Sequence, residues 1–156
     1  MIRPIGTIKR EIRILGLDTC GGEEVLGAIV RGGSFLDGIV RFKPQERTEQ
    51  KLAEDVLATK YYPELRALML HDTNNVFRTS VLQALVGLPV IKVSSARKKS
   101  KNYSVFRSSR GTLFHQSDIA SAVTARILAL TWSMGTLPEP VRIAHLLSKR
   151  AKFRAV

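Results

Sequence analysis

Residues 12–18 read IRILGLD, a short apolar run that ends in an acidic residue. An apolar run of this length, followed closely by Gly21 and Gly22, is typical of a strand buried inside a sheet. Two further strand patterns come next, VLGAIV over 25–30 and FLDGIVRF over 35–42, with the tight connection RGGS between them. We therefore predict a buried strand over 12–17, with Asp18 directly after it, as the first member of an antiparallel three-stranded meander.

Helix and strand patterns alternate through the rest of the chain. Thr48 is predicted to cap a helix whose apolar face contains Leu52 and Val56. Further strands are expected over 65–70 and 89–94, and further helices over 76–86, after Ser117 and from Pro140 onward. This order predicts an α/β fold of the ribonuclease-H-like type, with a five-stranded mixed sheet and helices packed on it. We expect one domain over residues 1–156.

The charge balance indicates the class of partner. The chain has 25 Lys and Arg residues against 13 Asp and Glu residues, a formal net charge of +12. Such an excess favours nucleic acid, because cations that neutralise phosphates release condensed counterions. A membrane surface is the competing interpretation, but no predicted helix pairs a basic face with a bulky aromatic one. No apolar run approaches the roughly 20 residues that span a bilayer.

The cysteine content and the first residues bear on the compartment. Cys20 is the only cysteine, so no internal disulfide can form, which fits a reducing cytosol. The start, MIRPIGTIKREIRILGLD, has charges on both sides of its apolar stretch, unlike a secretory signal. We expect a cytoplasmic protein.

Asp18 and Asp72 are the first candidates for chemistry. Asp18 ends the first strand pattern, and Asp72 stands just past the fourth in LRALMLHDTNN. If these strands lie side by side and parallel, their carboxyl ends meet, and ligands of α/β sheets gather there. Two carboxylates that face each other repel unless a cation lies between them, and oxygen ligands suit Mg²⁺ or Mn²⁺. The alternative is that both are ordinary turn or helix-capping aspartates.

Three further residues are candidates for the same site. Glu49 lies in the first turn of its predicted helix and shares the face that points at the sheet, which would make it a third carboxylate. A surface position favoured by the helix dipole is the alternative for Glu49. Arg142 and His145 lie three apart on one face of the last helix and are expected near the carboxylates. An ordinary core or surface histidine is the alternative for His145. Asp37 is expected to have a structural role in the RGGSFLDG turn.

A basic stretch follows the fifth predicted strand. Its cations are interleaved with the aromatic residues Tyr103 and Phe106, which suits phosphate contacts and base stacking. A solvated loop is the alternative. The cations that we expect to contact nucleic acid here are Arg97, Lys98, Lys99 and Lys101.

Two segments resemble known nuclease families. RGGSFLDGIVRF, residues 31–42, resembles the RGG-x-x-x-DG segment of the archaeal endonuclease dU family. LPEPVRIAHLLS, residues 137–148, is similar to the closing helix motif of that family and of endonuclease V. The resemblance implies a ribonuclease-H-like fold and Mg²⁺-dependent cleavage of one strand, near uracil in DNA for endonuclease dU and near hypoxanthine for endonuclease V.

The same resemblance implies roles for individual residues. The acids of the first and fourth strands correspond to Asp18 and Asp72, and His145 matches the histidine of the closing motif. Lys92, Arg97 and Lys98 compete for the basic residue expected near the fifth strand. The segment HDTNNVFRTSV lacks the glycine that usually follows the acid in these families. A catalytically inactive nucleic-acid-binding module of the same fold therefore stays open beside the endonuclease.

Overall fold

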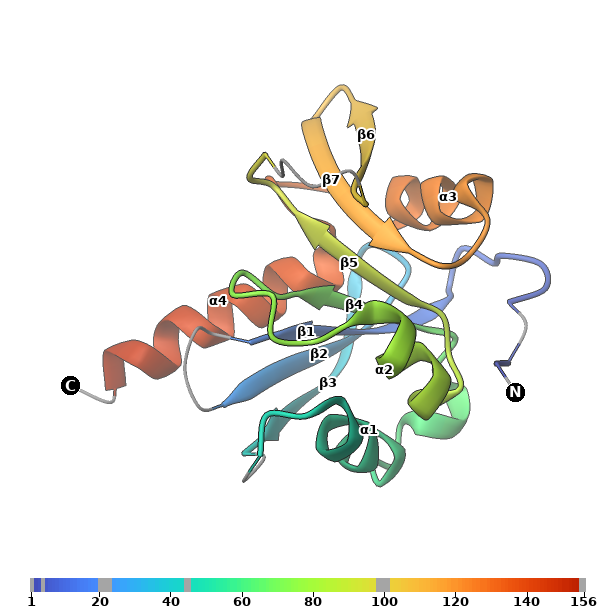
Figure 1. Ribbon diagram of the computed structural model, residues 1–156. Helices are drawn as coiled ribbons and strands as arrows, with labels where there is room; N and C mark the ends of the chain where they lie inside the picture. Colours follow the sequence, from blue (N-terminus) through green and yellow to red (C-terminus); the bar gives the residue numbers. More distant parts are fainter. Residues whose placement is uncertain (1, 4, 20–23, 44–45, 98–101, 155–156) are drawn as a thin grey trace.

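A central sheet organises the protein in the computed structural model, which describes residues 2–3, 5–19, 24–43, 46–97 and 102–154 (Figure 1). Within these residues the sheet has seven strands in the order β3-β2-β1-β4-β5-β7-β6. The strands are β1 (Arg13–Asp18), β2 (Val25–Arg31), β3 (Phe35–Phe42), β4 (Ala67–His71), β5 (Val90–Ser94), β6 (Ser104–Ser108) and β7 (Gly111–Ser117).

The pairing of the strands makes the sheet mixed. β1, β2 and β3 form an antiparallel meander, as predicted. β4 lies parallel to β1, and β5 lies parallel to β4. β7 then pairs antiparallel with β5, and β6 closes the sheet as the other strand of a hairpin with β7. Consequently the carboxyl ends of β1, β4 and β5 all lie at the same end of the sheet.

The expected count of five strands was wrong, because the described part of the sheet also contains the hairpin of β6 and β7. Much of this hairpin is polar and basic, so its sequence resembles a loop. Its apolar residues are nevertheless paired: Phe106 lies opposite Leu113, which is fully buried, and Phe106 packs on Trp132. Ser117 accordingly ends β7 instead of capping a helix.

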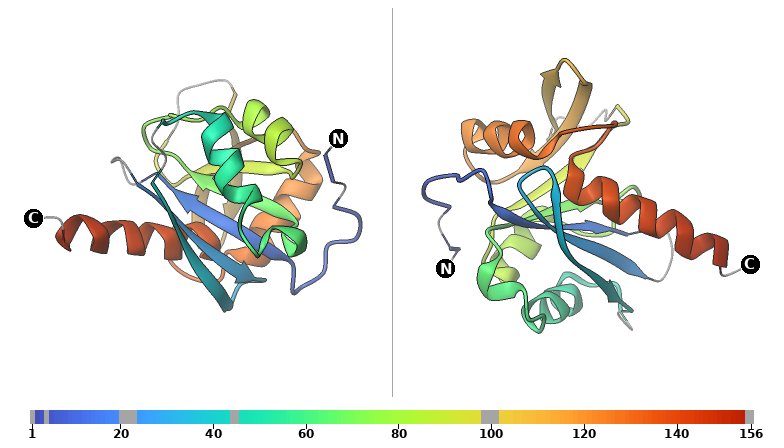
Figure 2. Two further views of the ribbon diagram at one scale, coloured as in Figure 1. Left: turned by 90° about the horizontal axis from the view of Figure 1, so that it is seen from below. Right: turned by 180° about the vertical axis from the view of Figure 1, so that it is seen from behind.

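Helices cover both faces of the sheet (Figure 2). The helices are α1 (Glu49–Leu57), the short 3₁₀ turn η1 (Tyr62–Glu64), α2 (Thr79–Val86), α3 (Ser121–Thr131) and α4 (Glu139–Arg154). The Thr48 side chain accepts a hydrogen bond from the Lys51 amide and caps α1 as predicted. Among the described residues, none of the helices has both the length and the apolar character that a bilayer crossing requires.

Alternation along the strands creates two apolar cores. Leu15 and Leu17 of β1 belong to the core beneath α1 and α2, whereas Ile14 belongs to the core beneath α3 and α4. Gly16 lies on the same face of β1 as Ile14. A Cβ atom on Gly16 would lie 2.2 Å from the backbone carbonyl carbon of Pro140. The first turn of α4 therefore rests directly on β1, which fixes the helix above the carboxyl end of that strand.

Candidate metal centre at the carboxyl ends of β1 and β4

The strand register brings Asp18 and His71 together. The two residues are partners at the ends of the parallel strands β1 and β4. Because side chains alternate along a strand, both leave the sheet on the face that α4 covers, as Met69 does. Both residues are buried, with exposed fractions of 3% for Asp18 and 6% for His71. Asp72, one residue later, belongs to the opposite face.

Three side chains meet at Asp18. Its Oδ2 atom lies 2.8 Å from His71 Nδ1 and 2.8 Å from His145 Nδ1. The two imidazole rings meet edge to face, with centroids 4.9 Å apart. One ligand atom from each of the three residues lies within 4.8 Å of the others, so the group can hold a metal ion. The His145 side chain is 32% exposed and opens the group to solvent.

The first turn of α4 places His145. Val141 and Ala144 are fully buried and fix the helix face that rests on the sheet. Arg142, which we expected at the site, instead donates hydrogen bonds of 2.7 and 2.5 Å to Glu139. This hydrogen bonding raises the pKa of Arg142 above its usual value. The Arg142 guanidinium thus stabilises the start of α4.

Asp72 is held in the turn after β4. Its Oδ2 accepts a hydrogen bond of 2.7 Å from the Phe77 amide, and its Oδ1 accepts one of 3.3 Å from the Thr19 hydroxyl. The buried Lys92 Nζ lies 3.6 Å from Asp72 Oδ2 and also donates to Asn75 and to the Phe77 carbonyl. Lys92 therefore compensates the charge of Asp72 and ties β5 to the turn.

Glu49 lies on the face of the sheet that α1 and α2 cover. It is buried, and its carboxylate accepts a hydrogen bond of 2.9 Å from Arg78 Nε. Burial by itself would raise the pKa of Glu49. The hydrogen bond and charge of Arg78, together with backbone hydrogen bonds, have the larger combined effect, so the pKa of Glu49 is lowered. The structure thus places the expected third carboxylate beside Arg78, outside the group formed around Asp18.

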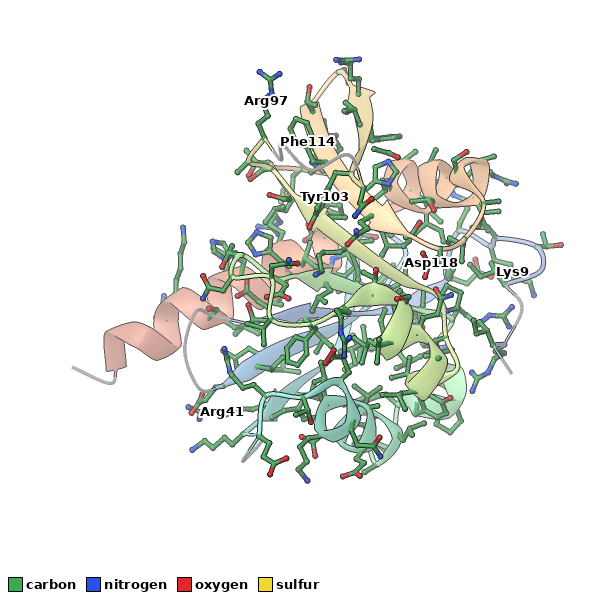
Figure 3. All side chains as sticks on the ribbon, in the orientation of Figure 1. Lys9, Arg41, Arg97, Tyr103, Phe114 and Asp118 are labelled. Atoms are coloured by element: carbon green, nitrogen blue, oxygen red, sulfur yellow. The ribbon has the colours of Figure 1, made fainter. Side chains whose placement is uncertain are left out.

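The basic stretch is only partly described. Arg97 is exposed just past β5, whereas Lys98, Lys99 and Lys101 lie outside the described residues. The labelled Arg97 side chain points outward past the end of β5 (Figure 3), and Arg107 and Arg110 are exposed on the hairpin of β6 and β7. Across the described ranges, no salt bridge forms at any of these three arginines. Their charges are therefore available to a partner.

Tyr103 is an aromatic residue of the same basic stretch. It lies just before β6 and is partly buried. Burial, and in second place the negative charge of Asp72, raise the pKa of the Tyr103 phenol above its usual value.

His71 is the residue that sequence reasoning missed. The strand was predicted over 65–70, which left His71 as a loop residue, but β4 includes it. The signal was the alternation in LMLHD, since His71 follows Met69 by two positions and faces the side of Asp18. Asp37, by contrast, has the structural role expected for it, because it accepts hydrogen bonds from Arg13 and Arg31 at the opposite end of β1.

Comparison of sequences finds archaeal relatives. A UPF0215 protein of Methanosarcina acetivorans is 31% identical, with 90% of this chain and 91% of the relative covered. A UPF0215 protein of Methanothermobacter thermautotrophicus is also 31% identical, with 90% of this chain and 88% of the relative covered. The sequence matches no protein-family profile.

Comparison of structures finds the same fold in other proteins. An Archaeoglobus fulgidus protein of unknown function has a TM-score of 0.73 at 16% identity, over 90% of this chain and 98% of that one. Endonuclease V of Bacillus subtilis has a TM-score of 0.66 at 13% identity, over 99% of this chain and 86% of that one. Argonaute of Marinitoga piezophila, solved with guide RNA and target DNA, has a TM-score of 0.59 at 12% identity, over 90% of this chain and 30% of that one. At these identities the likeness concerns the fold alone.

Proposed function

The chain belongs to the UPF0215 family of archaeal proteins, and we propose that it is a metal-dependent endonuclease that cleaves a phosphodiester bond in DNA. The finer proposal is the endonuclease dU type, which acts near a deaminated base, deoxyuridine or deoxyinosine. The observation that carries the proposal is the group of Asp18, His71 and His145, which lies where two parallel strands end. The fold it occupies is shared with endonuclease V.

The residues around Asp18 fit a divalent cation. Asp18 supplies a carboxylate oxygen, and His71 and His145 each supply a ring nitrogen. Asp72, which the sequence predicted as the second metal ligand, is held beside the centre by the Thr19 hydroxyl and the Phe77 amide, and we propose that it acts from outside the group of three. A cation bound by the group of three would polarise the scissile phosphate and activate water.

The protein's own side chains would prepare the reaction. Asp18 orients both imidazoles through hydrogen bonds of 2.8 Å. His145 is partly exposed, so we propose that it completes the centre on the side from which a substrate phosphate enters. Lys92 offsets the charge of Asp72, so the turn after β4 keeps its shape when a phosphate approaches.

The nucleic acid would bind across the basic end of the sheet. Arg97, Arg107 and Arg110 expose guanidinium groups that can contact phosphates, and the chain has a net charge of +12. Burial and the charge of Asp72 raise the pKa of the Tyr103 phenol, and we propose that the Tyr103 ring stacks on an unpaired base near the turn after β4. A damaged base costs less to unpair, which would favour its selection.

The test is cleavage of defined oligonucleotides. Labelled duplexes and single strands that contain uracil, hypoxanthine or only normal bases are incubated with the protein and Mn²⁺ or Mg²⁺. We expect a single cut near the damaged base, no cut in EDTA and no cut with Asp18→Asn. Cleavage that is equal on undamaged strands would overturn the base specificity, and cleavage that survives in EDTA would overturn the metal-dependent mechanism.

A non-cleaving nucleic-acid-binding module is the second candidate. It is favoured by the salt bridges at Asp72 and Glu49, whose carboxylates are partly compensated by Lys92 and Arg78. The absence of a glycine after Asp72 points the same way. Binding of the same oligonucleotides without any metal-dependent product would identify this candidate.

A further inference from the structure

Nitrogen donors predominate at the metal centre. Of the three residues whose ligand atoms converge, His71 and His145 are imidazoles and only Asp18 is a carboxylate. Mg²⁺ prefers oxygen ligands, whereas imidazole suits first-row transition metals such as Fe²⁺, Ni²⁺ and Zn²⁺. The donor set therefore differs from the carboxylate pair that the sequence predicted for Mg²⁺.

The spacing of the donor atoms fits a shared metal. Two ligands at neighbouring positions of an octahedral ion, with bonds of about 2.1 Å, lie about 3 Å apart. Asp18 Oδ2 lies 2.8 Å from each of the two Nδ1 atoms. The rings meet edge to face, so both Nδ1 atoms can point at one carboxylate without stacking. Small movements of the side chains would admit an ion among the three donors.

Burial of the centre also discriminates between metals. Asp18 and His71 are 3% and 6% exposed, so an ion that binds both must give up much of its water. Mg²⁺ loses water reluctantly and usually keeps several water ligands in proteins. The remaining opening is on the side of His145, where water or a phosphate oxygen can complete the coordination.

We propose that Asp18, His71 and His145 form a two-histidine, one-carboxylate site for a first-row transition-metal dication, which it binds in preference to Mg²⁺. This inference deepens the proposed function, because it names the class of metal that the nuclease would use. It assigns His71 as a direct ligand, beyond any role in orienting Asp18.

The test measures metal binding by the intact protein without nucleic acid. Calorimetry of the metal-free protein with Co²⁺, Mn²⁺ and Mg²⁺ should give a dissociation constant for Co²⁺ at least about tenfold below that for Mg²⁺. Pulsed electron paramagnetic resonance of the Mn²⁺-loaded protein should show couplings to two imidazole nitrogens. Mg²⁺ that binds as tightly as Co²⁺, or Mn²⁺ without nitrogen couplings, would overturn the proposal.

Single substitutions separate a ligand from an orienting residue. His71→Gln should remove one nitrogen coupling and weaken Mn²⁺ and Co²⁺ binding by about tenfold or more, while Mg²⁺ binding changes by less than about threefold. An unchanged number of couplings, with all metals weakened alike, would show that His71 only orients Asp18. His145→Gln lies in the more exposed position and provides the same test if His71→Gln folds poorly.

The third histidine of the chain provides the matched control. His115 is buried in β7, outside the group around Asp18, so His115→Gln should leave every metal affinity and both couplings unchanged. Loss of metal binding in this variant would contradict the assignment. Since no step uses nucleic acid, a preference for Co²⁺ over Mg²⁺ without any cleavage of DNA would refute the proposed function and leave the metal site standing.

Discussion

Asp18 and Asp37 are two carboxylates near opposite ends of the sheet, each held by two nitrogen-bearing side chains. Asp37 accepts hydrogen bonds from Arg13 and Arg31, at 3.1 and 3.0 Å. Asp18 contacts the Nδ1 atoms of His71 and His145, each at 2.8 Å. A guanidinium is a permanent cation with no acceptor lone pair, whereas a neutral imidazole offers one. The arginine pair gives Asp37 a structural role, whereas the histidine pair would allow Asp18 to share a metal, as we propose.

The two ends also use glycine differently. At the metal centre, Gly16 allows the first turn of α4 to rest on β1, which places His145. At the opposite end of β1, near Asp37, Gly32 has a φ of 58°, and its missing Cβ leaves room for the Arg10 carbonyl. Gly33 lies against the end of α3 in the same turn. The RGG segment that resembles the nuclease family thus lies at the opposite end of β1 from the proposed chemistry.

Removal of each carboxylate should give the largest contrast. We expect Asp18→Asn to lower the cleavage rate by about 100-fold or more, because a lost metal ligand removes several kcal/mol of transition-state stabilisation. Asp37→Asn should leave cleavage within about twofold and cost about 1 kcal/mol of unfolding free energy, since its ion pairs are partly exposed. Initial cleavage rates and urea unfolding measure the two effects. Equal losses of cleavage would contradict the division between the two ends.

Substitution by alanine should affect metal affinity at Gly16 but not at Gly32. Gly16→Ala is expected to cost about 2 kcal/mol or more, because α4 must shift to relieve the overlap with Pro140. That shift moves His145 away from Asp18, so metal affinity should fall with stability. Gly32→Ala should cost about 1–3 kcal/mol through backbone strain and leave metal affinity unchanged. Thermal unfolding and Mn²⁺ titration of both variants test this, and a Gly16→Ala protein with normal Mn²⁺ affinity would break the proposed coupling.

Arginines at the two ends should differ in their contribution to DNA binding. Replacing Arg107 and Arg110 by Ala should reduce the slope of log affinity against log salt by up to about 2, because each lost phosphate contact removes about 0.9. Arg10 and Arg126 line a cavity near the RGG turn and provide a matched double variant of equal charge. We expect the slope of that variant to match wild type in fluorescence anisotropy. Equal changes in both variants would mean that binding depends on net charge alone.

The smallest expected effect concerns His115. Burial lowers its pKa, so the folded protein binds fewer protons there than the unfolded chain does below a pH of about 6.5. The stability that depends on neutral His115 is therefore present above that pH and lost as pH falls toward the lowered folded pKa. His115→Gln should make the melting temperature less sensitive to pH between 7.5 and 5.5, as followed by circular dichroism. A steeper dependence in this variant would contradict the sign.

Much of the fold could be predicted from local patterns. The meander, the Thr48 cap and the position of Asp18 at the end of β1 follow from apolar runs and capping residues. The hairpin of β6 and β7 could not be predicted in this way, because Val105 is exposed and, among its described apolar residues, only Phe106 and Leu113 join the core beneath α3 and α4. Pairing with β5, not local sequence, makes these residues strands.

The candidate site was predictable in position but not in composition. Apolar strands that end in Asp18 and near Asp72 indicate the end of the sheet at which Asp18 and His71 lie side by side. Which side chains share a face depends on the strand register, and a shift of one residue exchanges His71 for Asp72. The close approach of α4 to Gly16 is a tertiary contact that leaves no pattern in the sequence around either element. His145 was nevertheless singled out, because the PEPVRIAH motif marks it.

Anomalous diffraction from crystals grown with Mn²⁺ tests the metal centre most directly. We predict one strong anomalous peak within about 2.3 Å of Asp18 Oδ2 and of the Nδ1 atoms of His71 and His145, a distance typical of metal–ligand bonds. The peak should vanish in Asp18→Asn crystals and persist in Asp37→Asn crystals. A peak at other residues, or no peak at saturating Mn²⁺, would contradict the assignment of Asp18 and its two histidines as the metal centre.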